Sequence, residues 1–192
     1  MKKILVILGH PSAQSFNHAL AEQYAAGAAA AGHEVRLLEL GTLQFDPVLR
    51  MGYQETQALE PDLQAAWEHI RWAEHLVWIF PTWWGGTPAL LKGFIDRVFL
   101  PGLAFKYRSN SAWWDKYLKG RSGHILTTMD TPQIYNWLVY RNSNIRSFKK
   151  ATLEFCGLKP VRVTVFDSLR FADEQRRKSF LEKAYIMGKA AA

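Results

Sequence analysis

The chain has 192 residues, a formal charge of +7 and a single cysteine, Cys156. A chain of this length buries roughly 70% of the surface that it exposes when unfolded, so we expect one domain, residues 1–192, that needs neither a disulfide nor a metal to fold. The basic residues are scattered rather than gathered in a dense run, which argues against nucleic acid and suits a site for a phosphorylated cofactor.

The N-terminal part of the chain reads as strand, helix, strand. Residues 4–8 form a continuous aliphatic run that stops at Gly9, a pattern typical of a parallel strand buried on both faces. An Ala-rich helix is expected from about residue 15 to residue 31, with Gly32 as its C-terminal stop. Residues 35–40 are the second expected strand.

The middle of the chain repeats this alternation. Residues 41–61 carry Gly, Pro and polar side chains without a clear period, and helical spacing returns over 61–73. An apolar third strand is expected at 76–80. The strongest helical pattern follows at about 88–98, where one apolar stripe begins just after a proline suited to the first turn.

The C-terminal part completes a five-stranded pattern. Residues 100–121 look like a long aromatic and basic loop, and 124–127 are a short fourth strand. Alternating valines mark a fifth strand at 161–165, and a basic amphipathic helix closes the chain from about 173 to 189. This alternation predicts an α/β fold: a flavodoxin-like open parallel sheet of order 2-1-3-4-5, with helices on both faces. Its ligand crevice lies where the strand order reverses.

The loop after the first strand, residues 9–17, is one candidate wall of that crevice. It joins a buried strand to a helix N-terminus, where free backbone N–H groups favour an anion such as a phosphate. Ser15 and Asn17 can add side-chain donors. On the residues alone, an ordinary helix-capping role for both remains open.

The loops after the third and fourth strands are the other candidate walls. In residues 81–88, two glycines let a backbone approach a ligand, and Trp83 and Trp84 offer an apolar wall. The alternative is an ordinary helix entry with both indoles folded inward. Residues 127–132 form the third wall, with Tyr135 and Tyr140 shortly after it.

Other chemistries have little support in the sequence. None of the six histidines is paired with Cys or a carboxylate at a metal-ligand spacing, so we expect no metal site. No serine occupies a nucleophile elbow, and Cys156 lies in an apolar segment that indicates a structural role. A site with an anion-binding wall, an apolar wall and a polar wall but no nucleophile or metal suits a cofactor that performs the chemistry itself.

Several short motifs, in order, resemble the flavodoxin-like NAD(P)H:quinone oxidoreductase family, which also includes ancillary proteins of bacterial potassium-efflux systems. The resemblance extends from residue 4 to about residue 165. The matching segments are His10-Pro11 with Ser15-Phe16-Asn17, Pro81 to Trp84, Leu90 to Gly93 with Asp96 to Phe99, and Phe155-Cys156-Gly157. It implies a flavoenzyme that passes hydride from NAD(P)H to quinones or similar acceptors by a ping-pong mechanism.

The resemblance also implies roles for individual residues. It places the flavin's phosphate-bearing tail against His10, Ser15, Phe16 and Asn17, the isoalloxazine against Pro81, Thr82, Trp83, Trp84 and Gly85, and its opposite edge against Thr127 and Thr128. Tyr135 matches a tyrosine that faces the flavin and stabilises charge during hydride transfer. This makes Tyr135 the candidate catalytic residue.

The sequence departs from the family pattern at two places. Met129 and Asp130 stand where the family usually has Gly-Gly. A carboxylate pointing at the flavin there would disfavour its reduction, unless Asp130 turns away and caps the following segment. Arg141 falls where the animal enzymes have a relay histidine, and an arginine can neutralise an oxyanion but cannot shuttle a proton.

The resemblance favours FAD slightly over FMN and leaves NADPH and NADH open as co-substrates. It implies a homodimer, with residues 41–61 and 100–121 as candidate contacts. No apolar run spans a bilayer and no signal cleavage site follows the N-terminus, so we expect a cytoplasmic protein, mature as written. Two alternatives stay open: a flavin-binding regulatory subunit of a transporter with incidental redox activity, and a one-electron carrier, which the basic charge disfavours.

Overall fold

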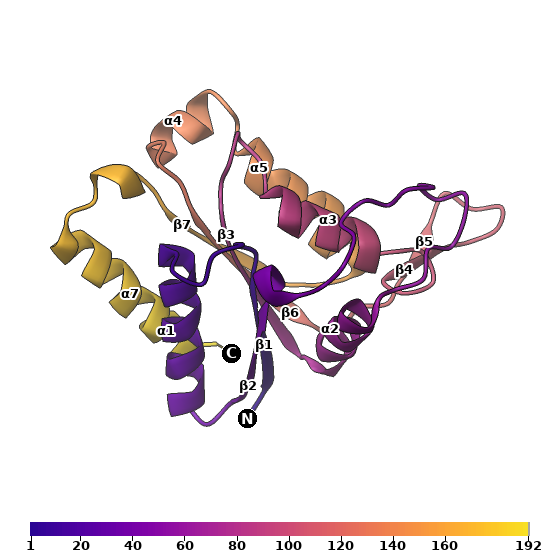
Figure 1. The fold of residues 1–192 in the computed structure, drawn as a ribbon, viewed down its shortest axis with the longest axis horizontal. Helices are drawn as coiled ribbons and strands as arrows, with labels where there is room; N and C mark the ends of the chain where they lie inside the picture. Colours follow the sequence, from indigo (N-terminus) through magenta and orange to yellow (C-terminus); the bar gives the residue numbers. More distant parts are fainter. Residues whose placement is uncertain (192) are drawn as a thin grey trace.

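The computed structural model describes residues 1–191, and a five-stranded parallel sheet forms its centre (Figure 1). The strands are β1 (Lys3–Leu8), β2 (Glu34–Glu39), β3 (His75–Pro81), β6 (Ser122–Thr128) and β7 (Val161–Phe166). Their spatial order is β2-β1-β3-β6-β7, with every neighbouring pair parallel. The predicted order 2-1-3-4-5 is therefore confirmed, with β6 and β7 as the fourth and fifth strands.

The four expected helices are also present. They are α1 (Phe16–Ala30), α2 (Pro61–Trp72), α3 (Ala89–Val98) and α7 (Glu174–Lys189). Local capping explains where two of them begin: the Ser15 hydroxyl accepts the His18 N–H at 3.1 Å, and the Asp173 carboxylate accepts the Arg176 N–H at 2.8 Å.

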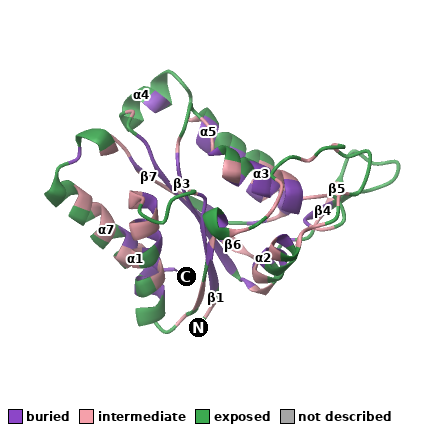
Figure 2. Ribbon diagram, viewed as in Figure 1, coloured by how far each residue is buried: buried purple, intermediate pink, exposed green. Residues whose placement is uncertain are grey.

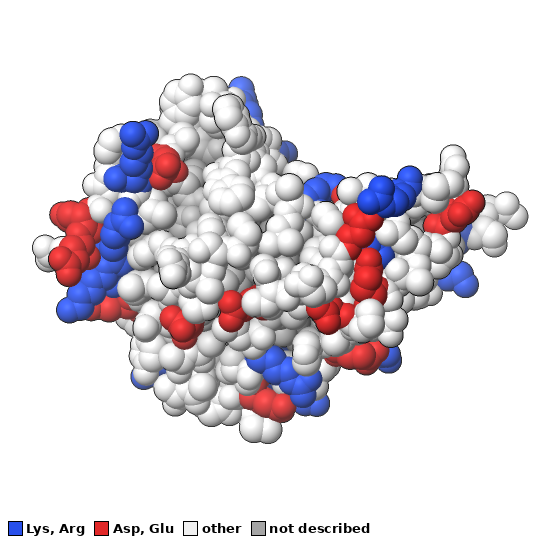
Figure 3. Space-filling model, in the orientation of Figure 1, with Lys and Arg blue, Asp and Glu red and all other residues white. Residues whose placement is uncertain are grey.

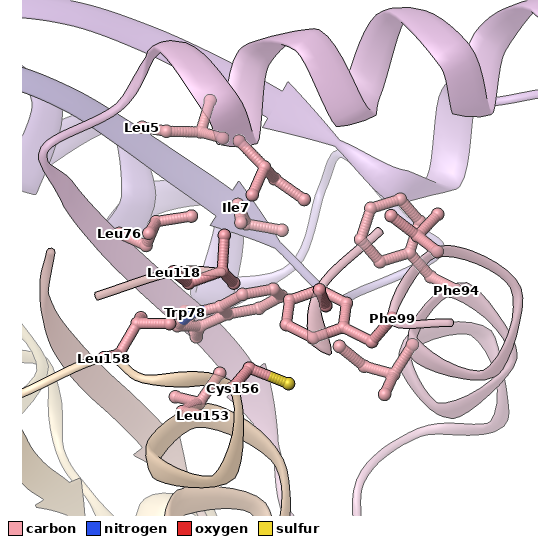
Figure 4. Close-up of a cluster of buried hydrophobic side chains, with 14 of the residues drawn as sticks. Leu5, Ile7, Leu76, Trp78, Phe94, Phe99, Leu118, Leu153, Cys156 and Leu158 are labelled. Carbon is pink, nitrogen blue, oxygen red and sulfur yellow. The ribbon is translucent and has the colours of Figure 1, made fainter. Parts of the chain in front are cut away.

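Helices cover both faces of the sheet, and each face has its own apolar core (Figures 1 and 2). Ile4, Val6 and Leu8 of β1 join the core shared with α1 and α7. Leu5 and Ile7 point to the other core, which includes Trp78 and residues of α2 and α3 (Figure 4). The continuous aliphatic run of β1 thus fills both cores, as expected for a central parallel strand.

The interpretation of residues 100–121 as a loop was incomplete. Two short antiparallel strands lie within it, β4 (Phe105–Tyr107) and β5 (Trp114–Lys116). The Trp114 ring stacks on Phe155 with centroids 4.4 Å apart, and its indole N–H donates to the Phe155 carbonyl at 2.9 Å. Strands of three residues are too short to show a period, and this distant packing partner is not visible in the local sequence.

Between the fourth and fifth strands lie short helices that the sequence pattern does not predict. The structure has α4 (Gln133–Leu138), α5 (Ser143–Arg146), the π-helical turn η2 (Ser147–Leu153) and α6 (Glu154–Cys156) there, and short 3₁₀ turns η1 (Leu40–Thr42) and η3 (Leu169–Phe171) elsewhere. Cys156 is buried in the core beside Trp78 (Figure 4), and burial raises the pKa of its thiol to about 12. A buried, protonated thiol agrees with the expected structural role.

No helix among residues 1–191 combines the length and the apolar character needed to cross a membrane.

Candidate functional site

The three candidate loops meet at the carboxyl ends of β1, β3 and β6. The Asn17 side-chain amide donates to the Thr128 hydroxyl at 3.0 Å, which joins the first loop to the end of β6. The backbone N–H of Thr82 donates to the Thr128 carbonyl at 2.7 Å, which joins the loop after β3 to the same residue. Asn17 and Thr128 are both buried, so Thr128 holds all three loops in register.

A second, partly buried chain of hydrogen bonds extends this connection to α5. The Thr82 and Thr127 hydroxyls are 3.0 Å apart, and the Asn144 amide donates to the Thr82 hydroxyl at 2.9 Å. The Asn144 Oδ1 atom is buried and has no hydrogen-bond partner among residues 1–191. A buried acceptor without a partner costs free energy. Asn144 was missed from the sequence because nothing local links it to Thr82, 62 residues away.

The loop after β3 turns outward at its tip. Trp83 and Gly86 exchange backbone hydrogen bonds of 3.0 and 2.9 Å across a tight turn in which Trp84 and Gly85 have φ angles of 49° and 69°. This left-handed backbone is rare for a bulky residue such as tryptophan. It holds the Trp84 indole fully exposed, whereas the Trp83 ring lies edge-on to His10 with centroids 5.5 Å apart. The alternative in which both indoles fold inward is therefore wrong for Trp84.

A hollow of about 440 Å³ lies beside this turn, and we call it the crevice hollow. Its volume is within the usual range for small-molecule sites. In Figure 3 the upper middle of the face viewed is largely uncharged, with Lys, Arg, Asp and Glu nearer its margins. The lining residues are Thr82, Trp84, Gly85, Met129, Asp130, Thr131, Asn136, Tyr140 and Ser143. Polar and aromatic walls, with Asp130 as the one charged residue among them, suit a flat heterocycle.

A further hollow of about 450 Å³ shares Gly85 and Ser143 with the crevice hollow. Asn144 is one of its lining residues, although the unpartnered Oδ1 atom is itself buried. Gly85 itself has nothing within 4 Å of the position that a Cβ would take. A ligand atom can therefore approach this backbone closely.

The first loop supplies a helix N-terminus beside the crevice. Ser15 caps α1, and the first-turn N–H groups of Phe16 and Asn17 have no intrahelical partner by geometry. The His10 Nδ1 atom accepts the Ser12 N–H at 2.9 Å, and partial burial lowers the pKa of His10. The positive end of the helix therefore leaves this loop open to an anion, while the neutral form of His10 adds no charge of its own.

The two tyrosines of α4 and its C-terminal turn have different positions. Tyr135 is about half exposed, and its ring contacts that of Tyr140 edge-on with centroids 5.6 Å apart. Tyr140 lines the crevice hollow and Tyr135 does not. The sequence resemblance singled out Tyr135. The structure adds Tyr140, five residues further along the chain, as the tyrosine that borders the crevice hollow.

The two departures from the family pattern also have distinct structural settings. One Asp130 carboxylate oxygen accepts the Arg170 N–H at 3.0 Å, which ties this residue to η3 rather than to the segment directly after it. Met129 is buried. Arg141 lines a separate hollow and is not part of the crevice hollow.

Comparisons with known proteins agree with this architecture. A family model described as flavodoxin-like fold matches residues 2–186. The chain is 28% identical to NAD(P)H dehydrogenase [quinone] 1 of Cavia porcellus, over 83% of this chain but only 66% of that protein, just under two thirds of its length. It is 26% identical to an uncharacterized NAD(P)H oxidoreductase of Haemophilus influenzae, over 94% and 91% of the two chains. The crystal structure of Smu.1420 from Streptococcus mutans superimposes with a TM-score of 0.85 at 33% identity, covering 97% and 98% of the chains.

Proposed function

Since the chain belongs to the Flavodoxin_2 family of proteins with a flavodoxin-like fold, we propose that it is a flavin-dependent NAD(P)H oxidoreductase that reduces quinones or similar organic acceptors. The similar proteins from Cavia porcellus and Haemophilus influenzae bear names of the same activity class. The observation that carries the proposal is the crevice hollow, which is lined by the loops after β3 and β6 and by residues of α4 and the turns after it, with the exposed Trp84 indole among its walls. A hydrogen bond from Asn17 to Thr128 ties the first loop to the same edge of the sheet.

The residues present fit a flavin. Trp84 offers an apolar face with no packing partner of its own, and the backbone N–H groups of Trp84 and Gly85 have no hydrogen-bond partner among residues 1–191. The start of α1 offers free N–H groups for a phosphate. FAD and FMN share the ring and the first phosphate, so this donor set suits both. The resemblance slightly favours FAD, and we propose FAD as the flavin on that ground.

We assign the holding residues as the resemblance implies. His10, Ser15, Phe16 and Asn17 would border the phosphate-bearing tail, Pro81, Thr82, Trp83, Trp84 and Gly85 one side of the ring, and Thr127 and Thr128 its other edge. Ser15, Asn17, Thr82 and Thr128 are already used in the hydrogen bonds that fix the loops. These side chains would therefore keep the loops in position, while backbone N–H groups would contact the flavin.

When bound, a flavin supplies a centre that accepts a hydride from reduced nicotinamide and returns it to an organic acceptor. The chain contributes alignment and preorganised donors around that centre. Tyr140 places a phenol at the open space, and Tyr135 packs against its ring. We propose that this pair stabilises the negative charge that develops during transfer, with Tyr135 as the residue singled out by the resemblance.

Donor and acceptor would occupy the same open side of the crevice hollow in turn, which gives ping-pong kinetics. NADPH and NADH are both candidate donors. We also propose that the protein acts in the cytoplasm as a homodimer. The hairpin of β4 and β5, which exposes Tyr107 and Trp113, is a candidate contact.

The same exposed hairpin favours one second candidate function, a flavin-binding regulatory subunit that docks on a transporter. Turnover separates the two proposals. The purified protein is extracted, its chromophore is identified by mass, and oxidation of NADPH and NADH is followed with a water-soluble quinone. A yellow protein that turns over rapidly without any partner supports the enzyme. A colourless protein that takes up neither FAD nor FMN on reconstitution would contradict both proposals.

A further inference from the structure

A neighbouring face of α4 and the turn after it carry another hollow, of about 350 Å³, lined by Trp137, Leu138, Arg141, Asn142 and Arg146. We call it the arginine hollow. Neither guanidinium has an ion pair or a side-chain hydrogen bond among residues 1–191, and no carboxylate lines this space. Nearby Lys149 and Lys150 differ in this respect, because both contact the Glu154 carboxylate, at 3.8 and 2.7 Å.

The backbone that presents Arg141 is fixed rather than loose. Arg141 and Asn142 both have left-handed φ angles, 54° and 51°, which non-glycine residues rarely adopt in succession. Buried Asn136 holds this turn, because its side-chain amide donates to Asn142 Oδ1 at 2.9 Å and its carbonyl accepts the Asn142 N–H at 3.1 Å. A strained turn locked by a buried side chain therefore places Arg141 beside Trp137.

The arginine hollow and the crevice hollow are lined by adjacent residues of α4 and the turn after it. Asn136 and Tyr140 line the crevice hollow, whereas Trp137 and Arg141, each the next residue in the chain, line the arginine hollow. A helix with its side chains is about 10 Å across. A dinucleotide with its nicotinamide in the crevice hollow could therefore lay its other half across α4.

We propose that the arginine hollow binds the adenosine 2′-phosphate end of NADPH and so makes NADPH the preferred donor. This inference rests on the proposed function and extends it. A phosphate monoester carries a charge of about −1.5 to −2 at neutral pH, and two unpaired guanidiniums suit it because each can donate two parallel hydrogen bonds. The half-exposed Trp137 indole offers a stacking face for adenine. NADH lacks the 2′-phosphate and gains nothing from the arginines.

Binding to the flavin-free protein tests this without any turnover. Calorimetry compares adenosine 2′,5′-bisphosphate with adenosine 5′-monophosphate and with inorganic phosphate. We expect the bisphosphate to bind at least about tenfold more tightly than either, and this advantage to disappear in the double variant Arg141→Gln/Arg146→Gln. Trp137→Leu should weaken both nucleotides alike. Equal binding of the two nucleotides would overturn the proposal, as would an advantage of the bisphosphate that survives in the double variant. Inorganic phosphate that binds as tightly as the bisphosphate would also overturn it, because the site would then recognise only an anion.

Kinetics of the flavin-loaded protein provide the second test. The double variant should raise the KM for NADPH and leave that for NADH unchanged, with little effect on kcat. Lys178→Gln/Lys183→Gln removes two exposed positive charges from α7 and serves as the control for net charge. Failure to bind flavin or to oxidise either nucleotide would contradict the proposed function and leave the calorimetric result valid. If the protein is active, and its kcat/KM values for NADPH and NADH are equal and unchanged by the double variant, this inference alone is contradicted.

Discussion

Gly27 of α1 and Gly188 of α7 lie at the contact between these helices, where each backbone packs directly against the other. A Cβ on Gly27 would overlap the Tyr185 carbonyl, and a Cβ on Gly188 would overlap the Tyr24 carbonyl. Both glycines are buried. This close approach fixes α7 against α1 on one face of the sheet and seals the smaller core, which includes Tyr24 and Ala184.

Gly27→Ala should therefore destabilise the protein by roughly 1–3 kcal/mol, because the added methyl group must push the two helices apart. Helix propensity alone predicts that this substitution stabilises the protein, since Ala is favoured over Gly in a helix interior by about 1 kcal/mol. Urea unfolding of the variant and the wild type measures the difference. Ala29→Gly, at an exposed position of the same helix, is the matched control, and it should lower the free energy of unfolding only by the difference in helix propensity. A Gly27→Ala protein more stable than the wild type would refute the packing argument.

A buried pair of histidines predicts that stability falls in mild acid. His75 and His124 lie 3.3 and 3.5 Å from the Tyr24 hydroxyl, and their other ring nitrogens contact Ser122 at 2.7 Å and Thr164 at 2.9 Å. Burial, together with nearby positive charge such as Arg162, lowers the pKa of each imidazole to about 4.

Because these histidines titrate near pH 6.5 when unfolded, the unfolded chain binds protons between about pH 6.5 and 4 while the folded chain does not. The two histidines do not affect the pH dependence above about pH 6.5, and they destabilise the folded state as the pH falls toward 4, by about 3 kcal/mol for one histidine. Unfolding free energies at pH 7.5, 6 and 5 test this. The double variant His75→Gln/His124→Gln should lose most of the slope, and an unchanged slope would assign the acid sensitivity to other groups.

The tyrosine pair gives a prediction about catalysis. Tyr140→Phe should lower kcat by tenfold or more while flavin stays bound, since its phenol borders the crevice hollow. Tyr135→Phe should lower kcat less, because Tyr135 does not line the crevice hollow and contacts it only through the Tyr140 ring. Stopped-flow reduction by NADPH, with flavin absorbance as the measure of occupancy, compares both. Tyr53→Phe, on an exposed loop, is the control. Unchanged rates in both variants would remove the tyrosines from the mechanism.

The hydrogen bonds among the crevice loops predict that Thr82→Val weakens flavin binding. Valine has nearly the same shape as threonine but leaves the Thr127 hydroxyl and the Asn144 amide without their shared partner. A buried polar group left unpaired costs about 1–3 kcal/mol. We expect a lower melting temperature and a flavin Kd raised several-fold, measured by quenching of flavin fluorescence. Thr87→Val, in the same loop, is the comparison, and equal effects of both substitutions would argue against the network.

Much of the fold follows from local patterns. Aliphatic runs such as residues 4–8 have to be buried on both faces, and the helices between them require right-handed crossovers, so the sheet order and the place of the crevice could be predicted. The outward position of Trp84, by contrast, depends on backbone hydrogen bonds across its turn. The helices between residues 133 and 156 are too short and irregular to show a period.

By itself, the sequence determined which segments form the sheet, which helices cover it and which loops stand at its carboxyl edge, because these depend on the spacing of apolar residues along the chain. Only the tertiary structure decided which side chains meet there. Asn17 and Thr128 are 111 residues apart, and Thr82 and Asn144 are 62 apart. A hydrogen bond between such residues exists only once the strands between them have paired. The same holds for Tyr140, which reaches the crevice hollow because Asn136 and Asn142 close the turn that follows α4.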